Sequence, residues 1–178
     1  MSASIELRQV RPEDKEAVVA FTEETWADRG GSDYIPRIFD EWIAGDGDDQ
    51  RTFVLDVDDG ADVAGICQGV MLGDDEAWAQ GMRVNPEFRG HGVSLDLTHG
   101  VFEWAAGAGA TVCRNMVFSW NVAGLGQSRA AGFAPATEFR WAHPDPDPDA
   151  DPDHAVTEDP DAAWRYWTDS HAREHLRG

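Results

Sequence analysis

The sequence predicts a layered α+β domain, in which helices pack on a β-sheet. Segments with alternating apolar and polar residues predict strands, and segments with apolar residues at i, i+4 and i+7 predict helices. Glycine, proline and aspartate cluster between these segments and predict turns. The predicted order is β-α-α-β-β-β-α-β-α-β. A chain of 178 residues is long enough for one domain with a substantial core.

The first predicted elements are a strand and two helices. Ile5–Val10 alternates as a strand does, and Arg11-Pro12-Glu13-Asp14 then opens a helix with proline and acids in its first turn. Residues 28–33 form a glycine-containing connection. The second helix places four apolar residues on one face: Ile35, Phe39, Trp42 and Ile43.

Three strands follow. Thr52–Val57 and Val63–Leu72 flank Asp58-Asp59-Gly60, which is a hairpin signal. The next strand, Glu76–Val84, is stopped by Asn85-Pro86, because proline cannot donate to a ladder and restricts the residue before it.

The segment after this strand combines glycines with the start of a helix. Arg89-Gly90-His91-Gly92 leads into a helix predicted by the spacing of Val93, Leu97 and Val101. The free N–H groups and positive dipole end of a helix N-terminus can hold a phosphate. Such a turn can also bind nothing, and the glycines alone leave both interpretations open.

The C-terminal half predicts three more elements and a tail. Thr111–Trp120 is a predicted strand, Asn121 caps a helix over Val122–Ala131, and Phe133–Trp141 is a last strand. We expect a domain over 1–143, an acidic Pro/Asp linker over 144–161 and a C-terminal segment over 162–178. A helix over Ala162–Leu176 carries Trp164, Tyr166 and Trp167, so we expect it to dock on the domain or on a partner subunit.

The net charge of −20 is extreme, with 14 basic and 34 acidic residues, and Lys15 is the only lysine. This field repels nucleic acid and anionic membranes, so we expect neither as a partner. The aspartate-rich, lysine-poor composition resembles that of halophile proteins, although an acidic protein of an ordinary cytosol is the alternative. No apolar run of about 18 residues and no secretion signal are seen, so we expect a cytoplasmic protein.

No metal site is expected. His171 and His175 have a ligand-compatible spacing, but no third ligand is near. Cys67 and Cys113 lie in apolar segments and predict buried free thiols.

Two motifs resemble the GNAT superfamily of N-acetyltransferases. Arg89, Gly92 and Ser94 occupy the family's [Gln/Arg]-x-x-Gly-x-[Gly/Ala] pattern, with serine as a departure. Asn121 followed by Gly132-Phe133 matches a second signature, and the order of elements agrees. The resemblance implies the GNAT fold: a mixed, mostly antiparallel sheet of six or seven strands, with about four helices, splayed between strands 4 and 5.

The resemblance also implies acetyl-CoA as co-substrate. Residues matching the family's positions for pantetheine and pyrophosphate are Met82, Val84, Arg89, Gly90, His91, Gly92, Val93 and Ser94, together with Asn121. The implied reaction is acetyl transfer to an amine of a small molecule or amino acid, by direct attack through a tetrahedral intermediate. The alternative is a non-catalytic acyl-CoA-binding module, and a homodimer is an open alternative to a monomer.

The catalytic residues are less clear from the sequence. Glu76 is a candidate general base, or a solvated acid at a strand end. Strand alternation predicts that its side chain shares a face with those of Trp78, Gln80, Met82 and Val84. Ser128 stands where many members carry the tyrosine that protonates the leaving thiolate. Three alternatives are open: Ser128 acts through a water molecule, the thiolate leaves unprotonated, or the activity is lost. Asp33 and Tyr34 are candidate substrate contacts, although Tyr34 is also typical of a core-edge aromatic.

Overall fold

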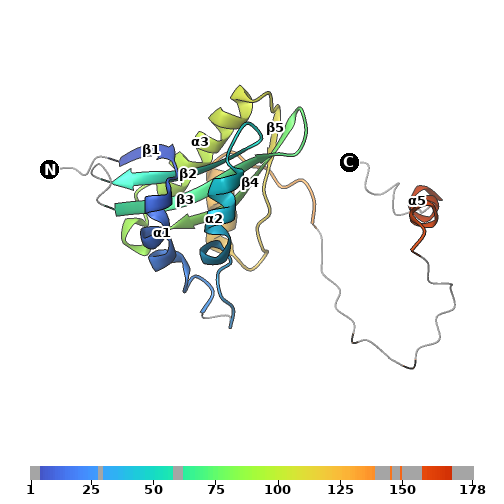
Figure 1. The fold of residues 1–178 in the computed structure, drawn as a ribbon, viewed down its shortest axis with the longest axis horizontal. Helices are drawn as coiled ribbons and strands as arrows, with labels where there is room; N and C mark the ends of the chain where they lie inside the picture. The colour runs from blue at the N-terminus through green and yellow to red at the C-terminus, as the bar shows by residue number, and fades with distance from the viewer. Residues whose placement is uncertain are drawn as a thin grey trace. The chain divides into compact units, whose positions relative to one another are not determined.

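The sheet in this computed structural model has five strands, in the order β1-β2-β3-β4-β5 (Figure 1). The structure describes residues 5–27, 30–57, 62–138, 145, 149 and 158–169. Neighbouring strands are antiparallel except for β4 and β5, which are parallel. The strands are β1 (Ile5–Gln9), β2 (Gln50–Val57), β3 (Asp62–Met71), β4 (Glu76–Val84) and β5 (Val112–Arg114).

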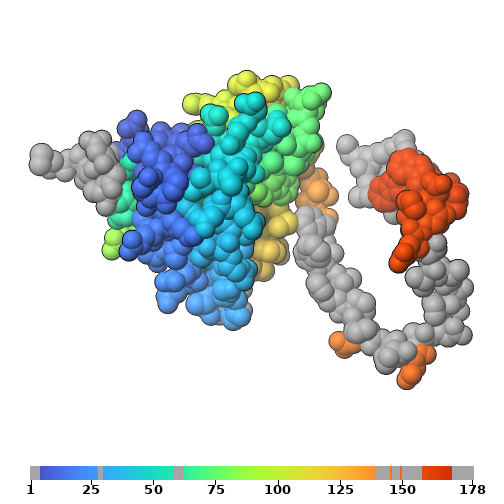
Figure 2. Space-filling view, in the orientation of Figure 1, coloured from blue at the N-terminus to red at the C-terminus, as the bar shows by residue number. Residues whose placement is uncertain are grey.

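Helices cover both faces of this sheet. On one face lie α1 (Lys15–Thr22) and α2 (Ile35–Gly45), which occupy the side seen in Figure 2. They enclose a core cluster that includes Val18, Phe39 and Ile66. On the other face lies α3 (Val93–Gly107). Its Leu97 and Val101 belong to a second core cluster, which also includes Leu55 of β2. The layered α+β arrangement expected from the sequence is therefore confirmed.

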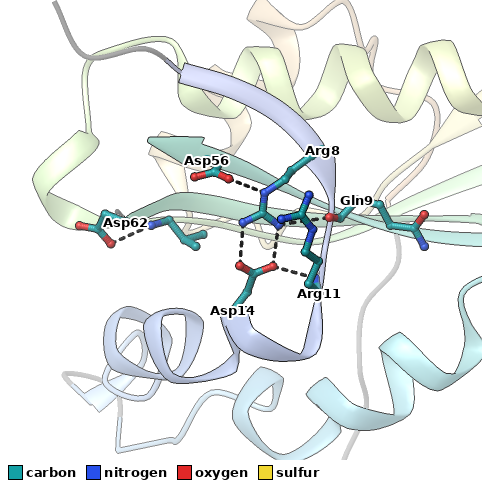
Figure 3. A network of polar contacts seen from close by, with 7 residues as sticks. Arg8, Gln9, Arg11, Asp14, Asp56 and Asp62 are labelled. Atoms are coloured by element: carbon teal, nitrogen blue, oxygen red, sulfur yellow. Dashed lines mark hydrogen bonds and ion pairs between the residues drawn. The ribbon is translucent and has the colours of Figure 1, made fainter. Parts of the chain in front are cut away.

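The N-terminal edge of the sheet is held by an arginine between two aspartates (Figure 3). Arg8 of β1 donates to both oxygens of Asp14, at 2.7 and 2.8 Å, and to Asp56 of β2. Asp14 ends the 3-10 helix η1 (Pro12–Asp14) and also accepts from the Arg11 N–H at 2.7 Å. Burial by itself raises the pKa of Asp14, but the hydrogen bonds from Arg8 and Arg11 outweigh it and lower the pKa.

Two predicted strands do not form as expected. The predicted strand Thr111–Trp120 is wrong beyond Arg114, because residues 115–120 do not pair with β4. The predicted strand Phe133–Trp141 is wrong over residues 133–138, and the rest lies outside the described residues. Phe133 instead gives its N–H to the Ser128 carbonyl at the end of α4 (Val122–Ala130), and Pro135 has no N–H to give. Over the described residues the sheet therefore has five strands, not six or seven.

The chain divides into two units, Met1–Ala136 and Thr137–Gly178. The second contains a fifth α-helix where about four were expected, α5 (Pro160–Asp169). Trp164, Tyr166 and Trp167 on this helix are exposed. The docking of this tail and the homodimer remain predictions. The turn 58–60, most of the linker and residues 170–178 lie outside the described residues.

Candidate active site

A β-bulge interrupts β4 at Gly81. Gln80 opposes Gln68 and Arg83 opposes Ile66, so two residues of β4, Gly81 and Met82, face one residue of β3. Gly81 has φ +65°, and a Cβ there would lie 2.1 Å from the ring of Trp42. Both the backbone conformation and the ring on α2 therefore require glycine.

The bulge changes which side chains share a face. A strand without a bulge would put Trp78, Gln80, Met82 and Val84 together with Glu76, and the sequence predicts that arrangement. The extra residue moves Met82 and Val84 to the α3 side, where both pack against the second core cluster. That prediction is wrong, and Gln80 and Arg83 are the side chains that face the α1–α2 side.

β4 loses its second partner just before the bulge. Pairing with β5 covers only Glu76–Trp78, opposite Val112–Arg114. Within the described ranges, the edge of β4 from Ala79 to Val84 pairs with no strand on this side. An exposed strand edge offers backbone N–H and C=O groups to an extended ligand.

The same strand leads into a turn with left-handed glycines. Gly90 has φ +79° and Gly92, which precedes the first turn of α3, has φ +85°. A Cβ at either position would meet nothing within 4 Å, so the backbone conformation and not space requires glycine here. The Gly92 carbonyl accepts from Leu95 and Asp96, which leaves the N–H groups of Val93 and Ser94 at the open end of the helix. A turn of this kind fits an anionic group.

The expected cofactor residues lie in three places. Arg89, Gly90, His91 and Gly92 are exposed in the turn, with Val93 buried and Ser94 half-buried behind them. Met82 and Val84 lie on the unpaired part of β4. Asn121 begins α4, and its side-chain oxygen accepts from the Gly124 N–H at 2.9 Å. The structure thus brings the β4 and α3 residues together along one path and uses Asn121 as a helix cap.

Glu76 lies at the other end of β4. It accepts from Arg114 Nε of β5 at 2.8 Å, and its side chain is 36% exposed. It is five residues from Gly81, about 16 Å along a strand. This geometry favours the alternative of a solvated, paired acid at a strand end.

Ser128 is almost fully covered, at 6% exposure. Its Oγ accepts from Asn115 Nδ2 at 2.9 Å. The neighbouring Gln127 donates to the Ser94 carbonyl and to Thr98 Oγ1 at 2.9 Å, which ties α4 to the first turns of α3. The hydroxyl of Ser128 is therefore packed between α4 and the segment that follows β5.

The α1–α2 connection carries a buried ion pair. The side chain of Asp33 is fully covered; it accepts from Arg83 through both oxygens and from the Ile35 N–H at 3.0 Å. The Arg83 guanidinium lies 5.3 Å from the Trp26 ring centre and 5.5 Å from that of Tyr34. Burial raises the pKa of Tyr34, so its phenol stays neutral around pH 7. Asp33 thus positions Arg83 and α2.

The sequence interpretation missed Arg83, Trp26 and Gln80. The bulge that orients Arg83 relative to Gln80 did have a signal in the sequence. Gly81 is an isolated glycine inside a strand pattern, which indicates a bulge. Polar Gln68 within an otherwise apolar strand was a second signal. No sequence pattern connects Arg83 or Gln80 to Trp26.

The two cysteines are not candidate nucleophiles. Burial raises the pKa of Cys67 to about 12 and that of Cys113 to about 11, so both thiols are protonated at neutral pH. Cys67 is buried as expected and Cys113 is half-buried. In the described part of the chain, no cluster of three or more potential metal ligands occurs; His171 and His175 lie outside it. None of the described helices is long and apolar enough to cross a membrane.

Several solved structures share this fold. AAC(6')-Iy in complex with the bisubstrate analogue CoA-S-monomethyl-acetylneamine has 19% identity and a TM-score of 0.64, over 80% of this chain and 99% of that one. A transcriptional regulator from Bacillus halodurans C-125 has 21% identity and a TM-score of 0.66, over 79% and 99%. Glucosamine-6-phosphate N-acetyltransferase from Arabidopsis thaliana has 14% identity and a TM-score of 0.57, over 80% and 99%.

These identities establish a shared fold and no more. No curated protein matches the sequence. The sequence profile of the acetyltransferase (GNAT) family matches residues 15–133, which include β4, the glycine turn and α3. The chain therefore belongs to the acetyltransferase (GNAT) family.

Proposed function

We propose that this protein is an N-acetyltransferase that transfers an acetyl group from acetyl-CoA to an amine of a small molecule or an amino acid. One observation supports this most directly. The edge of β4 that has no β5 partner, from Ala79 to Val84, leads through the short 3-10 helix Pro86–Phe88 to the Gly90–Gly92 turn and the open N-terminus of α3. An extended ligand with an anionic end, such as acetyl-CoA, fits that continuous path.

The cofactor roles follow this path. The pyrophosphate would lie against the backbone of Arg89–Ser94, and the pantetheine would pair with the backbone of Met82 and Val84. Because the Asn121 oxygen already caps α4, only its amide N–H groups remain to contact acetyl-CoA. Two similar structures of AAC(6')-Iy, one with CoA and one with a CoA-containing bisubstrate analogue, support a CoA site on this fold.

The chemistry requires a neutral amine and a stabilised oxyanion. A free alkyl amine is mostly protonated at neutral pH, so one proton leaves before or during attack. The amine nitrogen forms the new C–N bond, the thioester C–S bond breaks, and a backbone N–H near the β4 bulge would stabilise the intermediate oxyanion. Glu76 lies far from the bulge and pairs with Arg114, so as a base it would act only through solvent.

The packing of Ser128 favours departure of the CoA thiolate without direct protonation by a side chain. Its Oγ accepts from Asn115 and the residue is buried. This same observation supports the second candidate, an acyl-CoA-binding module without turnover. Both candidates require the CoA path along β4 and α3.

The acceptor class rests on the neighbours. Similar structures include an aminoglycoside N-acetyltransferase and a glucosamine-6-phosphate N-acetyltransferase, whose acceptors are both amines on small polar molecules. We therefore propose an amine on a small polar molecule as acceptor.

Thiol release from acetyl-CoA, measured with a panel of primary amines, tests the proposal. We expect amine-dependent release of CoA with at least one amine. The panel includes neamine, glucosamine 6-phosphate, histidine and phenylethylamine, each assayed at low and molar KCl. CoA binding by calorimetry without release on any amine would support the binding module instead.

A further inference from the structure

A line of side-chain hydrogen bonds crosses the α1–α2 side of the sheet. It starts at Asp46, directly after α2, and passes through Thr52 on β2 and Gln68 on β3 to Gln80 on β4. Thr52 Oγ1 lies 2.9 Å from Asp46 Oδ1, and Gln68 Nε2 lies 2.9 Å from Thr52 Oγ1. Gln80 Nε2 lies 2.7 Å from Gln68 Oε1. Thr52 and Gln68 are 1% and 0% exposed. We call these four residues the relay.

The carboxylate at one end sets the direction of every bond in the relay. Asp46 Oδ2 also accepts from the Thr52 N–H at 3.0 Å and from Gln9 Nε2 at 3.2 Å, so both oxygens of Asp46 are acceptors. The Thr52 hydroxyl must then donate its hydrogen bond to Asp46. Its oxygen is left to accept, which requires the amide nitrogen of Gln68 on that side.

The same logic orients the last residue. Since the Gln68 nitrogen faces Thr52, its oxygen faces Gln80, and Gln80 must present its own nitrogen there. Gln80 Oε1 is therefore the end of the relay that remains available as an acceptor. Within the described ranges no residue donates to this oxygen, and Gln80 is only half-buried.

This oxygen lies where β4 opens. Gln80 follows the last residue pairs of β4 with β5 and directly precedes the bulge at Gly81. Arg83 faces the same side across the bulge, but Asp33 already occupies its guanidinium. The polar group offered to a ligand from this face of β4 is thus an acceptor of N–H protons.

We infer that Gln80 Oε1 binds the N–H of the attacking amine and is held in that orientation by the relay from Asp46. The inference rests on the proposed function and adds a specificity-determining residue to it. An amide oxygen cannot take up the proton as a base, so Gln80 orients the amine while the proton goes to solvent. Primary amines and ammonium groups, which have N–H protons to spare, are the ligands that this oxygen selects.

Two substitutions test the role of the oxygen and of the relay. Gln80→Leu removes the acceptor, and we expect the KM for the best amine of the panel to rise about tenfold or more. The CoA affinity should stay within twofold. Thr52→Val interrupts the relay two strands away and frees the amide of Gln68. We expect it to raise the amine KM about threefold, but to have no further effect when combined with Gln80→Leu.

Thr22→Val is the matched control, since Thr22 is buried at 0% exposure on the same side of the sheet and bonds only to α1 backbone. It should cost stability like Thr52→Val and leave the amine KM unchanged. An amine KM within twofold of wild type in Gln80→Leu would overturn the inference while leaving the proposed function standing. If Thr52→Val raises the amine KM by the same factor in the wild type and in Gln80→Leu, the relay would be overturned. A wild-type protein without turnover on any amine would remove the proposed function and this inference together.

Discussion

The two edges of the sheet are built in opposite ways. At one edge, β1 pairs with β2 over its whole length, and Arg8 links it to Asp14 and Asp56. At the other edge, β5 pairs with β4 over three residues only, and the rest of β4 pairs with no described strand on that side. Each edge has an arginine–aspartate pair, but Arg8 joins neighbouring elements whereas Arg83 lies between aromatic rings beside the bulge. A closed edge supports the fold, and an incompletely paired edge leaves backbone groups for a ligand.

Substitution of Gly81 should have the largest effect, and it acts on the open edge. In Gly81→Ala the alanine must keep the positive φ of the glycine, and its Cβ would lie 2.1 Å from the Trp42 ring. We expect a loss of about 2–5 kcal/mol in the free energy of unfolding. Denaturant unfolding measures it, with Gly73→Ala as the control, because a Cβ there meets nothing within 4 Å. Equal stability of the two variants would contradict the bulge.

Asp14→Asn tests the closed edge. We expect a loss of about 1.5–3 kcal/mol, because Arg8 keeps Asp56 but loses its paired bond to Asp14. Acetyl transfer and CoA affinity should be unchanged. A change in either would mean that this edge contributes to the site.

The pH dependence of the same variant has a defined sign. The pKa of Asp14 lies below its ordinary value of 3.8 in the folded protein, so its contribution is complete above that value and is lost as the pH falls through the folded pKa. The stability difference between wild type and Asp14→Asn should therefore be constant at neutral pH and shrink below about pH 4. Denaturant unfolding of both proteins, from neutral pH down to about pH 3, measures this difference, and a difference that does not shrink in acid would contradict the ion pair.

A pair of variants at Gly92 tests the anion site on the open edge. Asparagine and aspartate have nearly the same shape and tolerate a left-handed conformation, but only aspartate adds a negative charge beside the bound phosphates. We expect Gly92→Asp to bind CoA at least about tenfold more weakly than Gly92→Asn, by calorimetry. Equal affinities would contradict a pyrophosphate at this turn.

Salt should change both edges alike and by the smallest amount. The net charge of −20 implies repulsion between acidic side chains, and salt screens it. The screening length falls from about 10 Å at 0.1 M salt to about 3 Å at 1 M salt. We propose a halophilic protein, and we expect its melting temperature to rise by several degrees between 0.1 and 2 M KCl. A melting temperature independent of KCl would favour the alternative of an acidic protein of an ordinary cytosol.

Elements built from local pattern could be predicted well from the sequence. The bounds Glu76–Val84 of β4 are as predicted, and the start of α3 at Val93 follows from the glycine turn. The Asn121 cap was also predictable, because a cap bonds to a backbone N–H only three residues away. The strand Thr111–Trp120 was not, because alternation indicates an extended chain but does not say whether a partner strand is beside it.

What the sequence by itself determined is the layer order, the glycine turn before α3 and the family motifs, since each depends on residues close together in the chain. Only the tertiary structure decided which faces β4 presents. The bulge depends on Trp42 packing against Gly81, and the orientation of Gln80 depends on Asp46, Thr52 and Gln68, contributed by other segments. Such contacts have no fixed spacing, so no local period reports them. The shift of one residue at the bulge then exchanges the faces of Met82 and Arg83, because side chains on a strand alternate with a period of two.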